Sequence, residues 1–139
     1  MPFKILKSIW HSKFSFLINI EKLKLENTTI SIVSTLDDSV CVETEDGQKI
    51  FELIKVALSE RRTVKLSFLN VEMLSSAFLN SAIGQLYRDF PERLIKENLI
   101  IENLSLSGGV SLKRVVSTAK LYYKDPEAMQ KIIDDILDE

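Results

Sequence analysis

The sequence predicts an α/β domain with a mixed sheet, helices packed mainly on one face of that sheet, and an N-terminal β extension. Short β-rich runs at 28–33, 63–68 and 99–102 are separated by segments whose apolar residues recur at steps of three and four. Helices between strands imply parallel crossover connections in one layered sheet. The chain has 139 residues, 45% of them hydrophobic and 27% charged, which suits one globular domain.

Residues 1–27 differ from the rest and form the predicted extension. They are basic, with five lysines against two glutamates. Four apolar residues at helical spacing predict a short amphipathic helix: Phe3, Leu6, Ile9 and Trp10. From Lys13 to Ile20 apolar residues alternate with others, which predicts an edge strand that forms a hairpin with 28–33.

Residues 28–139 form the predicted domain, and its first half is expected to run strand, loop, helix, strand. Thr28–Val33 is rich in β-branched residues, as strands are. The segment 36–47 holds acidic and small polar residues and predicts a loop with a brief strand inside it. A helix begins near Gly47. Thr63–Phe68 then alternates apolar and polar side chains, as a half-buried strand does.

For the second half, the sequence predicts a helix, a strand, a turn and two further helices, in that order. Ser75–Ser76 precede a helical apolar stripe that Pro91 ends. Leu99–Glu102 is a compact apolar run and predicts a strand, whereas Ser105–Gly109 predicts a turn because it is rich in serine and glycine. One helix follows this turn. The C-terminal helix opens at Asp125–Pro126, where aspartate can cap and proline fits the first turn.

Composition limits the classes of function. The net charge is -2 and the pI is near 5.5, so the chain has no basic field for a phosphate backbone and we expect no nucleic-acid partner. With one cysteine, Cys41, and one histidine, His11, it lacks an internal disulfide and the usual zinc ligands. We therefore expect no metal, no cofactor and a cytoplasmic setting. No apolar stretch approaches the roughly 20 residues of a transmembrane segment.

Five segments carry a resemblance to a known family. They are Glu45–Ile50, Val64–Phe68, Ser75–Asn80, Ile83–Leu86 and Ile101–Ser105. In this order they resemble the STAS-like domain family of unknown function, over residues 28–124 or so. The resemblance implies a mixed sheet with helices on one side, in a bacterial or phage-associated relative of the anti-sigma-factor antagonists. It also implies a non-enzymatic regulatory module that docks a protein partner, such as a kinase-like ATPase.

The resemblance points to one partner-binding face. Better-known relatives are switched by phosphorylation of a serine at a helix N-terminus, and Ser75 occupies that position here. We therefore expect Ser75, Ser76 and Asn80 to form the partner-binding surface, with Ser75 as the candidate switch. Those relatives have Asp before this serine and Gly two residues after it, whereas this chain has Leu74 and Ala77. This difference favours a docking surface over a phosphorylation site.

A second set of polar residues defines an alternative function. Asp46, Gly47, Gln85 and Asn103 flank the expected helices and strand ends. Ligands of open α/β sheets bind at strand ends, so these residues predict a polar site in a small-ligand or nucleotide-sensing domain. Capping, turn formation and backbone hydrogen bonds explain the same residues structurally. The sequence shows no motif that places a nucleophile beside a base, or two carboxylates together, so we do not expect an enzyme.

Overall fold

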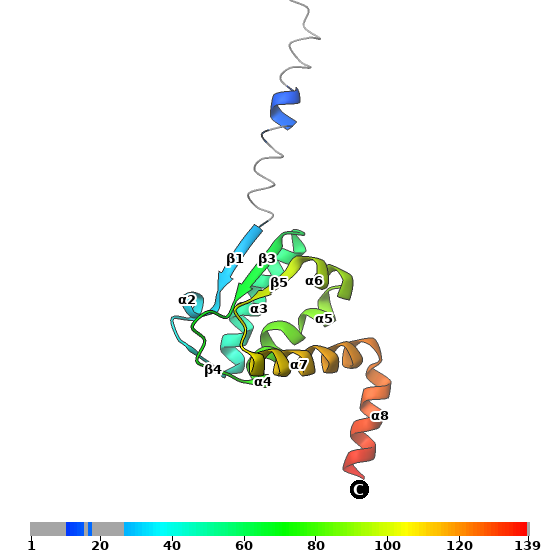
Figure 1. The fold of residues 1–139 in the computed structure, drawn as a ribbon. Coiled ribbons are helices and arrows are strands. Elements are labelled where there is room, and N and C mark those ends of the chain that lie inside the picture. Colours follow the sequence, from blue (N-terminus) through cyan, green and yellow to red (C-terminus); the bar gives the residue numbers. More distant parts are fainter. Residues whose placement is uncertain (1–10, 16, 18–26, 139) are drawn as a thin grey trace, which may run out of the picture.

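The computed structural model describes residues 11–15, 17 and 27–138 (Figure 1). Its strands are β1 (Asn27–Ser31), β2 (Val40–Cys41), β3 (Thr63–Ser67), β4 (Met73–Leu74) and β5 (Leu99–Glu102). The main sheet has the order β1-β3-β5, and β2 pairs with β4 in a second, smaller sheet. All these pairs are parallel, as crossover connections require. The predicted α/β class, with the three β-rich runs in one sheet, is confirmed.

Helices cover one face of the main sheet. Val64 and Leu66 of β3 point to that face and are fully buried. On the opposite face the register brings Thr29, Lys65 and Ile100 side by side, and all three are exposed. Because side chains alternate along a strand, this pattern means that one face is packed and the other is open. The prediction of helices mainly on one face is confirmed.

The helical elements vary widely in length. They are α2 (Ile32–Leu36), α3 (Thr44–Ser59), α4 (Ser76–Leu79), the π-helical turn η1 (Asn80–Gly84), α5 (Leu86–Asp89), α6 (Glu92–Asn98), α7 (Leu106–Lys124) and α8 (Pro126–Leu137). Elements α4, η1 and α5 follow one another along residues 76–89. The core lies between this segment, α3 and the sheet, where Phe51, Ile54, Phe78 and Leu86 are at most 1% exposed.

The edge strand expected from Lys13 to Ile20 is wrong for the part that the structure describes. Residues 11–15 and 17 are helical. Phe14 and Leu17 are three positions apart, which suits one face of a helix, and a helix satisfies its backbone groups without a neighbouring strand. The hairpin with 28–33 is wrong for the same reason. Residues 18–20, and the helix expected around residues 3–10, lie outside the described residues.

Two segments differ from the prediction because serine side chains cap helices there. The strand expected to reach Val33 ends at Ser31, whose hydroxyl accepts a hydrogen bond from the Ser34 amide at 3.3 Å and starts α2. The segment Ser105–Gly109, expected to be a turn, is the start of α7. Its Ser105 hydroxyl accepts from the Gly108 amide at 3.0 Å. A capped helix begins in both places where composition indicated strand or turn.

Candidate functional site

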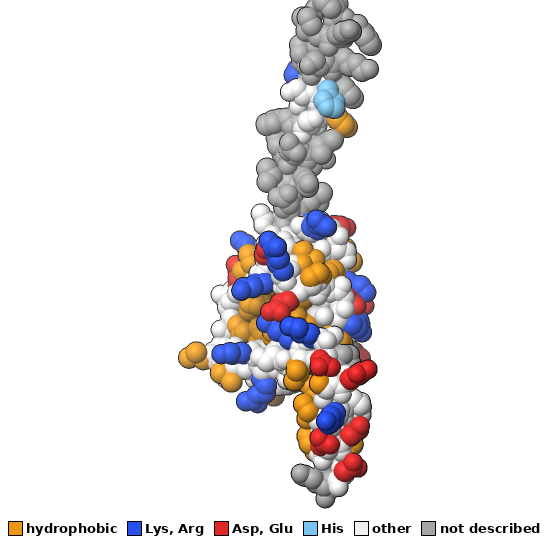
Figure 2. Space-filling view, turned by 90° about the vertical axis from the view of Figure 1, so that its right-hand side faces the viewer, with side chains coloured by type: hydrophobic (Ala, Val, Ile, Leu, Met, Phe, Trp, Pro, Cys, Tyr) orange, Lys and Arg blue, Asp and Glu red, His pale blue; other side chains and the backbone are white. Residues whose placement is uncertain are grey.

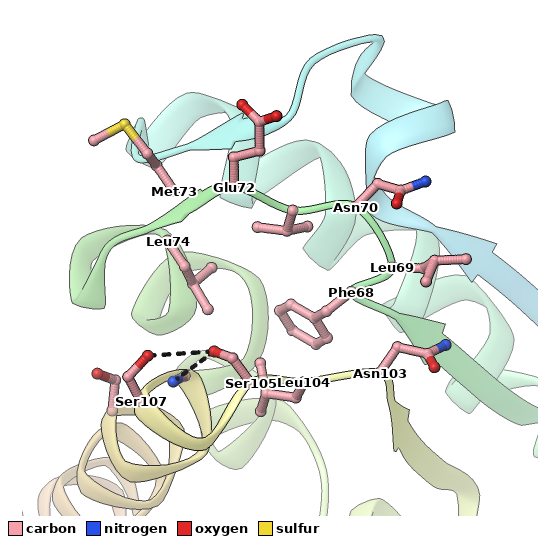
Figure 3. A pocket seen from close by; sticks show the side chains of 13 residues that line it. Phe68, Leu69, Asn70, Glu72, Met73, Leu74, Asn103, Leu104, Ser105 and Ser107 are labelled. Atoms are coloured by element: carbon pink, nitrogen blue, oxygen red, sulfur yellow. Dashed lines mark hydrogen bonds between the residues drawn. The ribbon is translucent and has the colours of Figure 1, made fainter.

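A groove of about 480 Å³ lies at the carboxyl ends of β3 and β5 (Figure 3). We call it the strand-end groove. It is lined by the loop after β3, strand β4, the loop after β5 and the start of α7, namely residues 68–74, 103–105, 107, 108 and 111. Open α/β sheets bind their ligands at this edge, because the connecting loops diverge there. The groove is therefore the first candidate for a functional site.

Two asparagines shape the strand-end groove. Asn70 and Asn103 follow the ends of β3 and β5 and have positive φ angles of 66° and 58°. Asparagine adopts this left-handed conformation more readily than most residues do. The Asn103 side-chain amide donates a hydrogen bond to Ser67 Oγ at 3.2 Å, which ties the end of β5 to the end of β3. Asn103, predicted for a polar site, thus lines the groove and also braces its wall.

Apolar side chains share the lining of this groove with polar ones. Phe68 and Leu74 point into it, and Phe68 is only 3% exposed (Figure 3). Leu69 and Met73 point outward at its edges and are 56% and 57% exposed. Leu106, which lies between two lining serines, is 92% exposed. Large apolar side chains gathered at one exposed place typically mark a contact surface.

The groove carries little charge. Among the described residues, Glu72 is the one charged residue that lines the groove, and no lysine or arginine does so. The Glu72 carboxylate accepts a hydrogen bond from the Ser39 hydroxyl at 3.2 Å. At the start of α7, the capping hydroxyl of Ser105 also lies 3.3 Å from the hydroxyl of Ser107. This wall thus offers hydroxyl groups, and no cationic side chain, to an anion.

Ser75 performs two structural tasks beside the groove. Its hydroxyl accepts a hydrogen bond from the Phe78 amide at 3.0 Å and so caps α4. The same hydroxyl donates to the Val42 carbonyl at 2.8 Å, which joins the start of α4 to the segment after β2. Ser75 is half-buried, whereas Ser76 is exposed. The Ser75 hydroxyl is therefore fully engaged, and Ser76 is the more accessible serine of the pair.

Asn80 faces a different hollow from the strand-end groove. It begins η1 and is exposed. With residues of α7 and α8, among them Thr118, Tyr122 and Met129, it lines a cavity of about 410 Å³. The residues predicted for the partner face therefore do not all lie at one place. Ser75 directly follows Leu74, which lines the strand-end groove, whereas Asn80 lies toward α8.

Asp46, Gly47 and Gln85 lie at the contact of α3 with η1. The expected capping role of Asp46 is wrong, because this residue is in the first turn of α3 and pairs with Lys49 at 3.0 Å. A Cβ on Gly47 would lie 2.7 Å from the Phe78 carbonyl oxygen, so this glycine allows close helix packing. Gln85 Nε2 donates to Gln48 Oε1 at 2.7 Å. None of the three lines the strand-end groove with Asn103.

Cys41 does not have the surroundings of a reactive cysteine. Its side chain in β2 is fully buried. Burial raises the pKa of the Cys41 thiol above its usual value, and the carboxylates of Asp38 and Asp46 raise it further. The thiolate is the nucleophilic form, so these surroundings suppress it. Cys41 is a packed core residue.

Within residues 11–15, 17 and 27–138, no cluster of three histidine, cysteine or acidic side chains is placed to hold a metal ion. None of the helices in this part of the chain combines the length and apolar character needed to cross a membrane.

Comparison with known families bears on the same part of the fold. A family model described as a STAS-like domain of unknown function matches residues 46–108, from the first turn of α3 to the first turn of α7. The matched segment contains β3, β4, β5 and nearly all of the strand-end groove. No curated protein and no solved structure matches the chain. Over residues 46–108 this chain is therefore similar to the STAS-like domain family of unknown function.

Proposed function

We propose that the chain is a non-enzymatic regulatory module that docks a partner protein at the strand-end groove. One observation carries the proposal: large apolar side chains remain exposed around an almost uncharged groove, with Leu69, Met73 and Leu106 between 56% and 92% exposed. Protein interfaces have apolar centres from which charged residues are depleted. A groove of this composition therefore suits a segment of another protein.

The alternative, nucleotide sensing, has less support from the groove. A nucleotide brings several negative charges, and these are usually held by lysine, arginine or free helix amides. The lining residues that the structure describes include no cation, and Glu72 would repel a phosphate. The N-terminus of α7 has its Gly108 amide already bonded to Ser105. Charge thus favours a protein segment over an anionic ligand.

The class of partner comes from the family resemblance. Better-known relatives bind a kinase-like ATPase and are switched by phosphorylation of a serine at a helix N-terminus, and the resemblance places Ser75, the cap of α4, at that position. In this chain Ser75 follows directly on Leu74, which lines the groove, so the predicted face and the groove adjoin. Strand β4 also pairs only with β2 among the described strands, which leaves its other edge available to an extended segment. We therefore propose a kinase-like ATPase as the partner, in a bacterial or phage-related regulatory system.

Calorimetric titration with a kinase-like ATPase encoded next to this gene tests the proposal. The variant Met73→Asp/Leu106→Asp places two charges in the apolar surface, and we expect it to bind at least about ten-fold more weakly than wild type, or roughly 1.4 kcal/mol. Val56→Asp is the matched control, because Val56 is 54% exposed on α3 and does not line the groove. Equal affinities for all three proteins would contradict the proposal.

A nucleotide titration separates the two functions. We expect ATP and other nucleotides to leave the thermal midpoint of the isolated chain unchanged. A ligand at 100 times its dissociation constant adds about 2.7 kcal/mol to the free energy of unfolding, which such a measurement resolves readily. A nucleotide-dependent rise, abolished by Asn103→Ala, would favour the ligand-sensing alternative instead.

A further inference from the structure

The C-terminal helix α8 leaves its apolar face exposed. It projects from the end of α7 (Figure 1), and a band of apolar side chains runs along it beside acidic ones (Figure 2). The most exposed members of this band are Ile132, Ile133, Ile136 and Leu137, at 46%, 38%, 65% and 76%. A helix with one apolar and one charged face is normally stabilised by packing of its apolar face. The face of α8 therefore has the composition of a surface that another molecule covers.

The same chain cannot supply this cover by folding α8 back along α7. Only Asp125 separates the two helices. Its amide donates to the Leu121 carbonyl at 3.1 Å and ends α7, and its carboxylate accepts from the Ala128 amide at 3.0 Å and starts α8. Two antiparallel helices need a connection of about two to five residues. This one-residue link is too short for such a hairpin.

The candidate receiving surface lies between α6 and α7. Two hollows of about 280 and 290 Å³ adjoin there and share Tyr87, Glu92 and Lys120. Apolar side chains line them, including Ile95 and Leu112 in one and Phe90 in the other. We call the pair the α6–α7 groove. Its lining is mainly apolar, as in grooves that accept amphipathic helices.

Charge makes α8 and the α6–α7 groove complementary. Three lysines line the groove, Lys96, Lys120 and Lys124, against the single carboxylate of Glu92, which pairs with Lys120 at 2.6 Å. The segment 126–138 has the opposite balance, with four carboxylates and one lysine. Two α8 helices packed on each other would bring carboxylates of like charge together, whereas α8 in this groove places them near lysines.

We propose that α8 of one copy binds in the α6–α7 groove of a second copy, and that the exchange is reciprocal. Met129, Ile132, Ile133 and Ile136 follow the spacing with which a helix anchors in a groove. A reciprocal exchange is a closed two-fold dimer, in which the same two surfaces are used twice. No residue of the α6–α7 groove lines the strand-end groove, so this dimer can form or fail independently of partner docking.

Sedimentation equilibrium of the full chain tests the exchange. We expect wild type to approach twice the monomer mass of 15.9 kDa as its concentration rises. The helix variant Ile132→Asp/Ile136→Asp and the groove variant Lys96→Glu/Lys124→Glu should each dimerise at least about ten-fold more weakly. All four substituted side chains are exposed, so both variants should keep the wild-type fold, which circular dichroism checks. Leu53→Asp, an exposed position on α3, should dimerise as wild type does.

Mixing the two variants makes the test specific. The helix variant keeps an intact groove and the groove variant keeps an intact α8, so an equimolar mixture should form a heterodimer with one complete contact. A wild-type chain that stays monomeric at high micromolar concentration would overturn the exchange. So would a dimer that the groove variant leaves unchanged, because α8 would then be packing on a second α8.

Discussion

Helices α3 and α8 are both amphipathic, but the apolar face of α3 is buried and that of α8 is exposed. In α3, Ile50, Ile54 and Leu58 are fully buried against the sheet and residues 76–89. In α8, Ile132 and Ile136 are 46% and 65% exposed. The sequence pattern is the same in both, since apolar residues recur at steps of three and four. Periodicity thus predicts which face of a helix needs cover, but not which molecule provides it.

The largest effect that follows from this comparison concerns one isoleucine in each helix. Ile54→Ala removes a fully buried side chain, so we expect the free energy of unfolding to fall by about 2–5 kcal/mol. Ile136→Ala should change it by no more than about 0.5 kcal/mol at protein concentrations where any dimer is dissociated. Urea denaturation measures both values. Similar losses for the two variants would mean that α8 is packed as tightly as α3.

A pair of glycines gives a smaller effect of opposite sign. A Cβ on Gly47 would lie 2.7 Å from both the Phe78 carbonyl oxygen and Ser81 Cβ, so Gly47→Ala should lower the free energy of unfolding by about 1–3 kcal/mol. Gly109, inside α7, has no atom within 4 Å of such a Cβ. Gly109→Ala should therefore raise the stability by about 0.5–1 kcal/mol through helix propensity. Two changes of the same sign would contradict this account of Gly47.

Gly47 illustrates what sequence patterns leave open. Next to Asp46 it predicted a turn, because glycine is frequent where the backbone needs a positive φ. The structure instead places it inside α3, and none of the chain's described glycines has a positive φ. The absence of a Cβ at Gly47 lets η1 pack closely against α3. A single sequence does not distinguish a glycine needed for its backbone from one needed for its small size.

Local sequence pattern was enough to predict the strands of the main sheet, but not the secondary structure of every segment. Thr63–Ser67 was predictable because its alternation matches one packed and one open face. The strand expected from Lys13 to Ile20 was wrong because a short alternating run also fits a helix, and only a neighbouring strand would decide between them. The helical start of α7 was missed because its serine and glycine residues are common in turns as well.

The candidate site was predictable only in part. Asn103 follows from its place at the end of a strand. The exposure of Leu69 and Met73 in the groove lining, and of Leu106 between two lining serines, was not predicted, because exposure depends on how distant segments pack. The signal that could have found Leu106 is a large apolar residue between two serines in an expected turn. The hydrogen bond from Ser75 to the Val42 carbonyl spans 33 positions and has no local signature.

The contrast between the packed domain and the exposed helix α8 can also be tested on single hydrogen bonds, at the caps that begin α4 and α8. Ser75→Ala removes both a cap and the bond to Val42, so we expect a loss of about 1–2 kcal/mol in the free energy of unfolding. Asp125→Ala removes the cap of an exposed helix and should cost no more than about 0.5 kcal/mol, while it lowers the helical signal in circular dichroism. A larger loss from Asp125→Ala than from Ser75→Ala would show that α8 supports the domain.

The smallest predicted effect is a pH dependence of the free energy of unfolding, caused by a buried thiol. Burial raises the pKa of the Cys41 thiol, and the charges of Asp38 and Asp46 act in the same direction. As the pH rises, the thiol therefore ionises first in the unfolded chain, and the unfolded state then binds fewer protons than the folded state. The free energy of unfolding should fall once the pH exceeds about 8.5, the ordinary pKa of a thiol.

Urea denaturation of wild type and Cys41→Ala, from about pH 7 to about pH 10, isolates this contribution. Tyrosine and lysine residues titrate in both proteins, so only the difference between the two slopes reports on the thiol. We expect wild type to lose more stability over this range than Cys41→Ala does. Ile136→Ala on α8 should keep the wild-type slope, because the Cys41 side chain is buried in the core cluster, to which Ile136 does not belong. Equal slopes for wild type and Cys41→Ala would mean that water reaches the thiol in the folded protein, and that the region around β2 is as open as α8.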